Sequence, residues 1–177
     1  LIVLPLLLIV GCSSPEPINY EETLNERDGV FYTKDTNEPY SGPVFSLYDD
    51  GKKNKEGTFK DGKEDGLWTW WYSDGKKKEE GTFKDGKKDG LWTEWYYNGQ
   101  KKSETTYKDG KLDGLRTGWY ENGQKWSEAT YKDGEVNGLS TGWHENGQKK
   151  YEGTFKDGEE ISNECWDEDG NEKDCPW

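Results

Sequence analysis

Glycines recur in this sequence at intervals of 24 residues, and this periodicity limits the chain to a repeat architecture. Series of glutamate and threonine, and two further series of glycine, keep the same spacing. Units of this length cannot bury an apolar face alone, so neighbouring units must cover one another. The repeat-defining glycines and tryptophans are Gly51, Gly75, Gly99, Gly123, Gly147, Trp71, Trp95, Trp119 and Trp143.

Each repeat contains an Asp-Gly or Asn-Gly pair between two runs of alternating strand-forming residues. Such a pair predicts a hairpin with a two-residue type I′ turn. Around Asn98-Gly99, this turn would place Trp95 opposite Lys102 and Thr93 opposite Glu104. A cross-strand glutamate of this kind is a structural partner of threonine or lysine rather than a catalytic carboxylate.

A second turn signal in each repeat is a Lys-Asp-Gly triplet, for example at residues 108–110. We expect these triplets to begin a longer connection to the next repeat. The first and last copies are imperfect, as the caps of an array should be: residues 28–42 carry a longer loop, and residues 166–170 are one position out of phase.

The composition excludes most alternatives to a repeat array. Leu, Ile, Val and Phe are scarce and the net charge is −13, a combination typical of disordered chains, yet the chain holds 10 Trp and 11 Tyr. Aromatic rings that shield each other between adjoining hairpins resolve this conflict. The sequence therefore predicts an all-β fold over residues 29–177: an elongated, single-layer antiparallel meander of stacked β-hairpin repeats with degenerate terminal caps. The acidic balance argues against a nucleic-acid partner.

The N-terminal segment of the sequence predicts export from the cytoplasm. Residues 1–11 are an apolar run typical of a signal peptide, whose basic n-region we expect upstream of Leu1. The motif Ile9-Val10-Gly11-Cys12 resembles a bacterial lipobox, which predicts cleavage before Cys12 and its lipidation; a cleaved signal with an incidental cysteine is the alternative. Ser13 after the lipidated residue favours the outer membrane if the source is Gram-negative. Polar residues 12–28 are expected to form a tether.

Three stretches carry a family resemblance: GLWTEWYYNGQKK (90–102), GLRTGWYENGQKW (114–126) and GLSTGWHENGQKK (138–150). They resemble the shorter bacterial variant of the MORN repeat, and the likeness extends over about residues 28–170. The resemblance implies a twisted meander of hairpins and a non-catalytic scaffold for protein or membrane-surface contacts. Bacterial relatives are often labelled antitoxin-like, but a lipobox would place this chain outside the cytoplasm, away from an intracellular toxin.

Few residues suggest catalysis. The single histidine, His144, takes the place of a tyrosine in the repeat, and we find no nucleophile–base motif, phosphate loop or histidine-rich metal cluster. We therefore expect no enzyme activity, no cofactor, no metal site and no small-molecule substrate, with weak divalent-cation binding at Asp-Gly turns as the alternative. Cys165 and Cys175 are expected to form a disulfide in an exported chain.

Three tryptophans break the repeat pattern and are the predicted partner-binding residues: Trp68, Trp70 and Trp126. Exposed tryptophans dominate protein interfaces, although most aromatic residues of such an array would cover one another. The leading hypothesis is a lipid-anchored module that binds an unidentified protein, or a polysaccharide whose sugar rings stack on these side chains. The alternative is an antitoxin or immunity-type protein that neutralises a toxin by direct binding.

Overall fold

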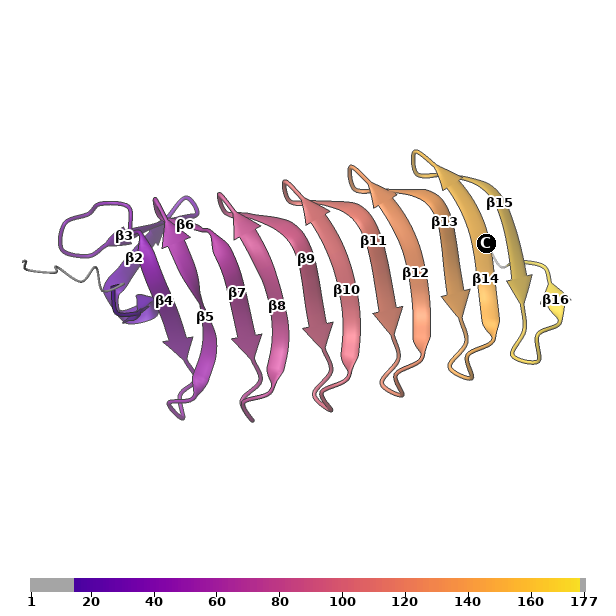
Figure 1. The fold of residues 1–177 in the computed structure, drawn as a ribbon, viewed down its shortest axis with the longest axis horizontal. Helices are drawn as coiled ribbons and strands as arrows, with labels where there is room; N and C mark the ends of the chain where they lie inside the picture. Colours follow the sequence, from indigo (N-terminus) through magenta and orange to yellow (C-terminus); the bar gives the residue numbers. More distant parts are fainter. Residues whose placement is uncertain (1–14, 176–177) are drawn as a thin grey trace, which may run out of the picture.

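A computed structural model describes residues 15–175, which form one long sheet of sequential hairpins. Figure 1 shows the strands side by side in chain order, so that the sheet is a long twisted ribbon. The sheet is largely antiparallel and repeats every 24 residues or so, which confirms the predicted all-β meander. The predicted signal peptide of residues 1–11 and the predicted lipidation site Cys12 lie outside the described residues.

The main sheet has 14 strands, and each repeat contributes one antiparallel pair. Its long strands are β4 (Gly42–Leu47), β5 (Lys53–Lys60), β7 (Gly66–Trp71), β8 (Lys77–Lys84), β9 (Lys87–Trp95), β10 (Lys101–Lys108), β11 (Lys111–Trp119), β12 (Lys125–Lys132), β13 (Glu135–Trp143), β14 (Lys149–Lys156) and β15 (Glu159–Trp166). A two-residue strand, β6 (Lys63–Glu64), also pairs with β5. The remaining short elements lie at the two ends of the sheet.

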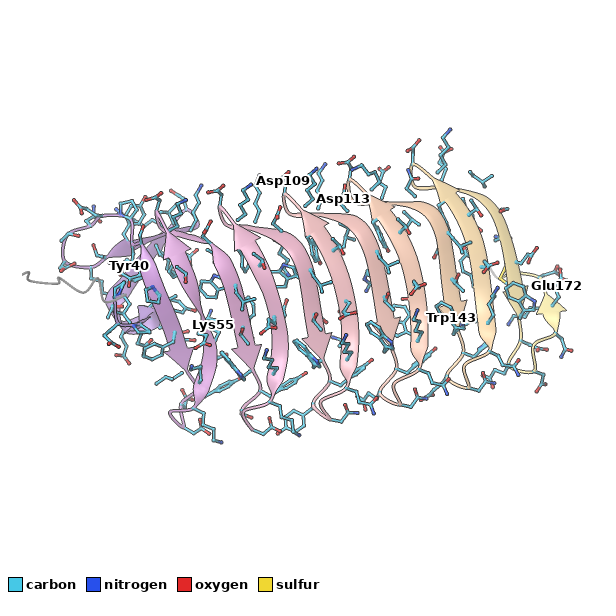
Figure 2. The ribbon with its side chains drawn as sticks, in the orientation of Figure 1. Tyr40, Lys55, Asp109, Asp113, Trp143 and Glu172 are labelled. Atoms are coloured by element: carbon cyan, nitrogen blue, oxygen red, sulfur yellow. A yellow bond between two sulfur atoms is a disulfide. The ribbon has the colours of Figure 1, made fainter. Side chains whose placement is uncertain are left out.

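The Lys-Asp-Gly triplets form tight turns rather than the longer connections predicted from the sequence. Lys108 pairs with Lys111, so the loop holds two residues, Asp109 and Gly110. Both have positive φ, 50° and 85°, as a type I′ turn requires. Figure 2 places Asp109 at the rim of the sheet where these turns lie. The prediction was wrong here because the triplet itself closes the hairpin.

The Asn-Gly pairs adopt a different turn from the predicted one. Gly99 has a φ of 88°, whereas Asn98 is not among the residues with positive φ. The Gly99 N–H donates to the Tyr96 carbonyl at 2.9 Å, and the Tyr96 N–H donates to the Gln100 carbonyl at 2.8 Å. The loop therefore holds three residues and ends in a glycine bulge, so the predicted type I′ geometry is wrong at this end of the hairpin.

This bulge changes the register for one pair only. Trp95 lies opposite Lys101, not Lys102 as predicted, because a register shift falls between Lys101 and the following pairs. Beyond the shift the predicted pairing is confirmed, since Thr93 lies opposite Glu104. The bulge also moves one side chain to the other face. Lys102, predicted on the face of Trp95, lies on the opposite face and pairs with Glu94, while Lys101 takes the predicted place beside Glu104.

The segment predicted as a tether is folded from Ile18 onwards. This segment forms β1 (Ile18–Asn19), which runs parallel to β4, then α1 (Tyr20–Thr23) and β2 (Leu24–Arg27), which pairs with β3 (Val30–Thr33). Tyr20 and Leu24 are buried against Phe59 and Trp68. The tether prediction is wrong for residues 18–28, because these apolar side chains cover the aromatic rings that the first repeat would otherwise expose.

The opposite end of the sheet is closed by β16 (Glu172–Lys173), which pairs with β15. A disulfide joins Cys165 in β15 to Cys175, just after β16. Each outer edge of the main sheet is thus occupied by a two-residue strand, β1 or β16. Short strands at both edges discourage the addition of further strands from other chains.

Candidate binding surface

The two faces of the sheet differ in how strictly they repeat. Strand pairing places Thr93 and Glu104 on one face, and Trp92 and Thr105 on the other. We call the first the repeating face, because its positions hold the same residue in four successive repeats. Its series are Leu67, Leu91, Leu115 and Leu139; Thr69, Thr93, Thr117 and Thr141; Glu80, Glu104, Glu128 and Glu152; and Lys77, Lys101, Lys125 and Lys149.

Contacts on the repeating face link each unit to the next. Lys101 forms an ion pair with Glu104, and its Nζ lies 5.8 Å from the ring centroid of Trp119 in the following unit. The Thr117 hydroxyl donates to Glu128 at 3.3 Å. The glutamate series therefore contacts threonine and lysine, as the sequence predicted. The lysine lies three residues earlier on the same strand in all four repeats, and the cross-strand threonine donates to the glutamate in three of them, from Thr69, Thr117 and Thr141.

A ladder of tyrosine hydroxyls also connects the repeats. The Tyr96 hydroxyl donates to the backbone carbonyl of Trp119 at 2.7 Å, and equivalent bonds join the other units. In the last unit, His144 takes the tyrosine position, and its Nε2 lies 3.0 Å from the Trp166 carbonyl. The single histidine thus occupies a structural rung of the array, the place that its position in the repeat predicted.

The other side of the sheet, which we call the variable face, carries different residues in successive repeats. The position of Trp92 holds Trp, Trp, Arg and Ser along the array. The position of Glu94 holds Trp, Glu, Gly and Gly, and that of Lys102 holds Lys, Lys, Trp and Lys. The strand pairing is the same in each unit, so these side-chain differences change how the variable face packs or what it can bind.

In the first repeats the variable face is closed by aromatic rings that pack edge-to-face or at a tilt. The Trp92 indole lies flat over Gly81, where a Cβ would come within 2.2 Å of the ring, and Trp68 covers Gly57 in the same way. Ring centroids of Trp92 and Phe83 are 5.0 Å apart. Only 2% of Trp68 and 3% of Trp92 is exposed. This region is a thin hydrophobic core on one side of a sheet.

The structure separates the three predicted binding tryptophans. Trp68 is buried, so the expectation of an exposed Trp68 is wrong: the ring fills the space above Gly57. Trp70 is half-buried and lies 5.6 Å from Trp92, centroid to centroid. Trp126 is 37% exposed. Of the three, Trp126 alone offers a largely open ring.

A groove of about 360 Å³ lies beside Trp126, at the point where the series Trp68, Trp92 is interrupted by Arg116. Without a third indole, the space over β10 and β11 stays open. Its lining residues are Glu94, Tyr96, Lys102, Ser103, Thr105, Tyr107, Arg116 and Trp126.

The groove is lined by an ion pair on one side and by Arg116 on the other. The Lys102 ammonium lies 3.2 Å from the Glu94 carboxylate. Arg116 has no carboxylate within 4.0 Å among residues 15–175, and its guanidinium lies over the Trp126 ring in a cation–π contact, with the guanidinium carbon 5.6 Å from the ring centroid. The groove therefore contains a guanidinium with no carboxylate partner among residues 15–175, next to the flat ring of Trp126.

The ring of Trp126 packs against a glycine of the neighbouring strand. It lies over Gly118, where a Cβ would approach the indole Nε1 to 2.4 Å. Other repeats with lysine at this position pair it differently, as Lys102 does with Glu94. The indole thus lies close over the backbone of β11.

A second hollow, of about 460 Å³, lies beside the disulfide at the C-terminal end. Its lining residues include Lys150, Tyr151, Glu160, Asn163 and Lys173. Burial, followed by the charge of Glu160 and the hydrogen bond to it, raises the pKa of Tyr151 to about 12. Tyr151 is therefore a neutral, protonated side chain at physiological pH.

Comparison with known families agrees with this repeating architecture. A family profile described as "MORN repeat variant" matches residues 64–85, 88–109, 112–133 and 136–157. Residues 64–157 are an array of MORN repeats. Each matched segment spans one hairpin closed by a three-residue Asx-Gly loop and ends at the first residue of the following type I′ turn. A comparison with curated protein sequences gave no match.

Within residues 15–175, no helix has the length and apolar character needed to cross a bilayer. The same part of the chain holds no group of three or more His, Cys, Asp or Glu side chains arranged to bind a metal ion. The MORN repeats belong to a scaffold family that is generally non-catalytic.

Sequence reasoning missed Arg116. The signal was present, because Arg116 interrupts a column that begins with Trp68 and Trp92. The prediction considered each tryptophan by itself and therefore overlooked the arginine. A repeat that lacks an indole present in its neighbours indicates an open site more directly than an extra tryptophan does.

Proposed function

We propose that this chain is a non-catalytic, lipid-anchored scaffold outside the cytoplasm that binds a partner macromolecule through the variable face of its MORN repeats. The observation that carries the proposal is the contrast between the faces: one repeats the same residues in four units, while the other changes from unit to unit. A face that only holds the array together has no reason to differ between units.

The residues of the groove suit a binding role. Tryptophan and arginine are enriched among the residues that contribute most to interface affinity. Trp126 presents an exposed ring that lies over Gly118, and Arg116 presents a cation with no ion-pair partner among residues 15–175. An aromatic ring and a guanidinium are both typical of binding hot spots. Here the guanidinium carbon of Arg116 lies 5.6 Å from the ring centroid of Trp126.

The proposed anchor rests on the lipobox ending at Cys12. Ile18 follows Cys12 by six residue steps, so the first strand would stand within about 20 Å of the anchoring lipid. Six strand spacings separate β4 from β11 in the sheet, which places the groove about 29 Å further along the array. The array would act as a spacer that presents the groove away from the anchored end.

The anchor is tested by metabolic palmitate labelling of the full-length precursor. We expect labelling that requires Cys12, so Cys12→Ala should abolish both labelling and membrane association. Processing should also stop when the lipoprotein signal peptidase is inhibited. An unlabelled wild-type protein that is released in soluble form would contradict the anchor but leave the binding role open.

The binding role is tested by cross-linked pull-down from detergent-solubilised envelopes. Trp126→Lys is the key variant, because lysine stands at this position in the other repeats and should preserve the fold. Leu115→Gln, an exposed position on the repeating face of the neighbouring strand, is the matched control. We expect a stoichiometric partner that Leu115→Gln retains and Trp126→Lys loses. Equal recovery by both variants would refute a partner on the variable face.

An immunity-type role is the alternative carried over from the family resemblance. It predicts that a toxic protein encoded nearby is tolerated only when this chain is co-expressed. The same pull-down distinguishes the two roles, since the recovered partner can be expressed alone and scored for toxicity.

A further inference from the structure

The groove at Arg116 and Trp126 contains several polar groups that have no partner among residues 15–175. No hydrogen bond within the described chain uses the side chains of Ser103, Thr105 or Tyr107. The Arg116 guanidinium likewise has neither an ion pair nor a hydrogen bond there. Three hydroxyls and a guanidinium thus face one space beside a flat indole.

We infer that this groove binds a sugar residue that carries a carboxylate, such as a hexuronic acid unit of a polysaccharide. The inference rests on the proposed binding role of the variable face and names its ligand class. The indole of Trp126 would stack on the sugar ring, the guanidinium of Arg116 would pair with the carboxylate, and Ser103 and Thr105 would bond the ring hydroxyls.

Each part of the groove selects for a different part of that ligand. A flat aromatic surface favours the apolar face of a pyranose ring. The planar guanidinium donates two parallel hydrogen bonds to a carboxylate, a geometry that a neutral sugar cannot use. The ion pair of Lys102 with Glu94 at the wall supplies both a donor and an acceptor for further hydroxyls.

Other ligand classes fit these features less well. An acidic peptide would satisfy Arg116 but has no saturated ring to cover the indole of Trp126. An apolar segment would leave the guanidinium and three hydroxyls without partners, at a cost in free energy.

The neighbouring repeat provides an internal comparison. There the equivalent space is filled, because the indole of Trp92 lies over Gly81. In the repeat with the groove, Thr105 replaces this glycine and Arg116 replaces the indole. Two changes at paired positions have turned part of a core into an open polar surface, while the repeating face beneath is unchanged.

The inference is tested with defined polymers in affinity gel electrophoresis. The probes are polygalacturonate, its fully methyl-esterified form, and poly-L-glutamate as an acidic polypeptide. We expect wild-type protein to be retarded by polygalacturonate and by neither of the other two. Retardation by the ester as well would refute the role of the carboxylate, and equal retardation by poly-L-glutamate would replace the sugar with an acidic protein partner.

Variants taken from the other repeats locate the site without disturbing the fold. Arg116→Ser and Trp126→Lys each introduce the residue found at the same position of the following repeat. We expect each to weaken binding of polygalacturonate at least tenfold, and Arg116→Lys to weaken it less than Arg116→Ser. Leu115→Gln, on the opposite face of the same strand, should bind like wild type.

The outcomes separate the ligand class from the function. If no polymer binds but the pull-down recovers a protein lost with Trp126→Lys, the sugar inference fails and the binding role stands. If polygalacturonate binds equally to wild type and to Arg116→Ser, the site is elsewhere and the inference fails. If neither experiment finds a ligand of the variable face, both proposals fall.

Discussion

The first and the later repeats of this array share a backbone and a repeating face but use the variable face differently. Around Trp68 and Trp92, glycines in the preceding strand admit indoles that are almost wholly buried. Around Arg116 the same space is a groove of about 360 Å³. The comparison teaches that the turns and the repeating face suffice to build the sheet. The variable face is then free to become a core in one unit and a surface in another.

The sharpest test of this difference compares two tryptophans. Trp92→Ala should lower the free energy of unfolding by about 3–5 kcal/mol, because it removes a buried ring and leaves a cavity. Trp126→Ala, at a ring that is 37% exposed, should cost less than half as much. Urea unfolding followed by circular dichroism measures both. Equal losses would show that the two regions are packed alike.

The ends of the array offer a second contrast, between a packed end and a cross-linked end. The N-terminal end is closed by Tyr20 and Leu24, whereas the C-terminal end carries the disulfide between Cys165 and Cys175. Replacing both cysteines with serine should cost about 2–3 kcal/mol, the value expected for a short closed loop. Hydrogen exchange should then rise in β15 and β16 but not in β4. Uniform loss of protection would contradict this localisation.

A matched pair of strand glycines refines the comparison. A Cβ at position 81 would lie 2.2 Å from the Trp92 ring, so Gly81→Ala should destabilise the protein by about 1–3 kcal/mol. The nearest atoms to a Cβ at position 142 lie at 3.7 Å, and Gly142 has no positive φ. Gly142→Ala should therefore stabilise by about 0.4–1 kcal/mol. Thermal denaturation of the two variants gives the sign, and destabilisation by Gly142→Ala would refute the open packing of that repeat.

The groove can also be converted back into core. Arg116→Trp alone should gain little, because Thr105 occupies the space that Gly81 leaves open under Trp92. Combined with Thr105→Gly, it should show a favourable coupling of about 0.5–3 kcal/mol in a double-mutant cycle. Additive effects would mean that the glycine does not control the position of the indole. The double variant should also lose binding of polygalacturonate.

The last expected effect is a dependence on pH at the C-terminal hollow, confined to alkaline conditions. Because burial and Glu160 raise the pKa of Tyr151 to about 12, the fold favours the neutral phenol. The stabilisation is fully present below pH 10, the ordinary pKa, and is lost as the pH rises from 10 to 12. Ionisation measured at 295 nm should show one late-titrating tyrosine that is missing in Tyr151→Phe. A tyrosine that titrates near pH 10 would contradict the burial.

The sequence predicted the architecture more reliably than the individual sites. Glycine spacing and the pairing of Thr93 with Glu104 follow from periodicity alone and were confirmed. The turn types were exchanged between the two ends of the hairpin, since an Asx-Gly pair fits both a type I′ turn and a glycine bulge. Only the hydrogen bonds of Tyr96 and Gly99 decide between them.

What the sequence by itself determined is the sheet, because identical residues at a fixed interval impose the same hairpin and the same contacts on every unit. What only the tertiary structure decided is which aromatic side chains are core and which are surface. Trp68 and Trp126 are both departures from the repeat, but one lies over Gly57 beneath the N-terminal segment and the other lies over Gly118 beside an open groove. The burial of a tryptophan depends on the residue beneath it in the neighbouring strand and on the segment that covers it. It therefore cannot be predicted from the tryptophan's own position in the repeat.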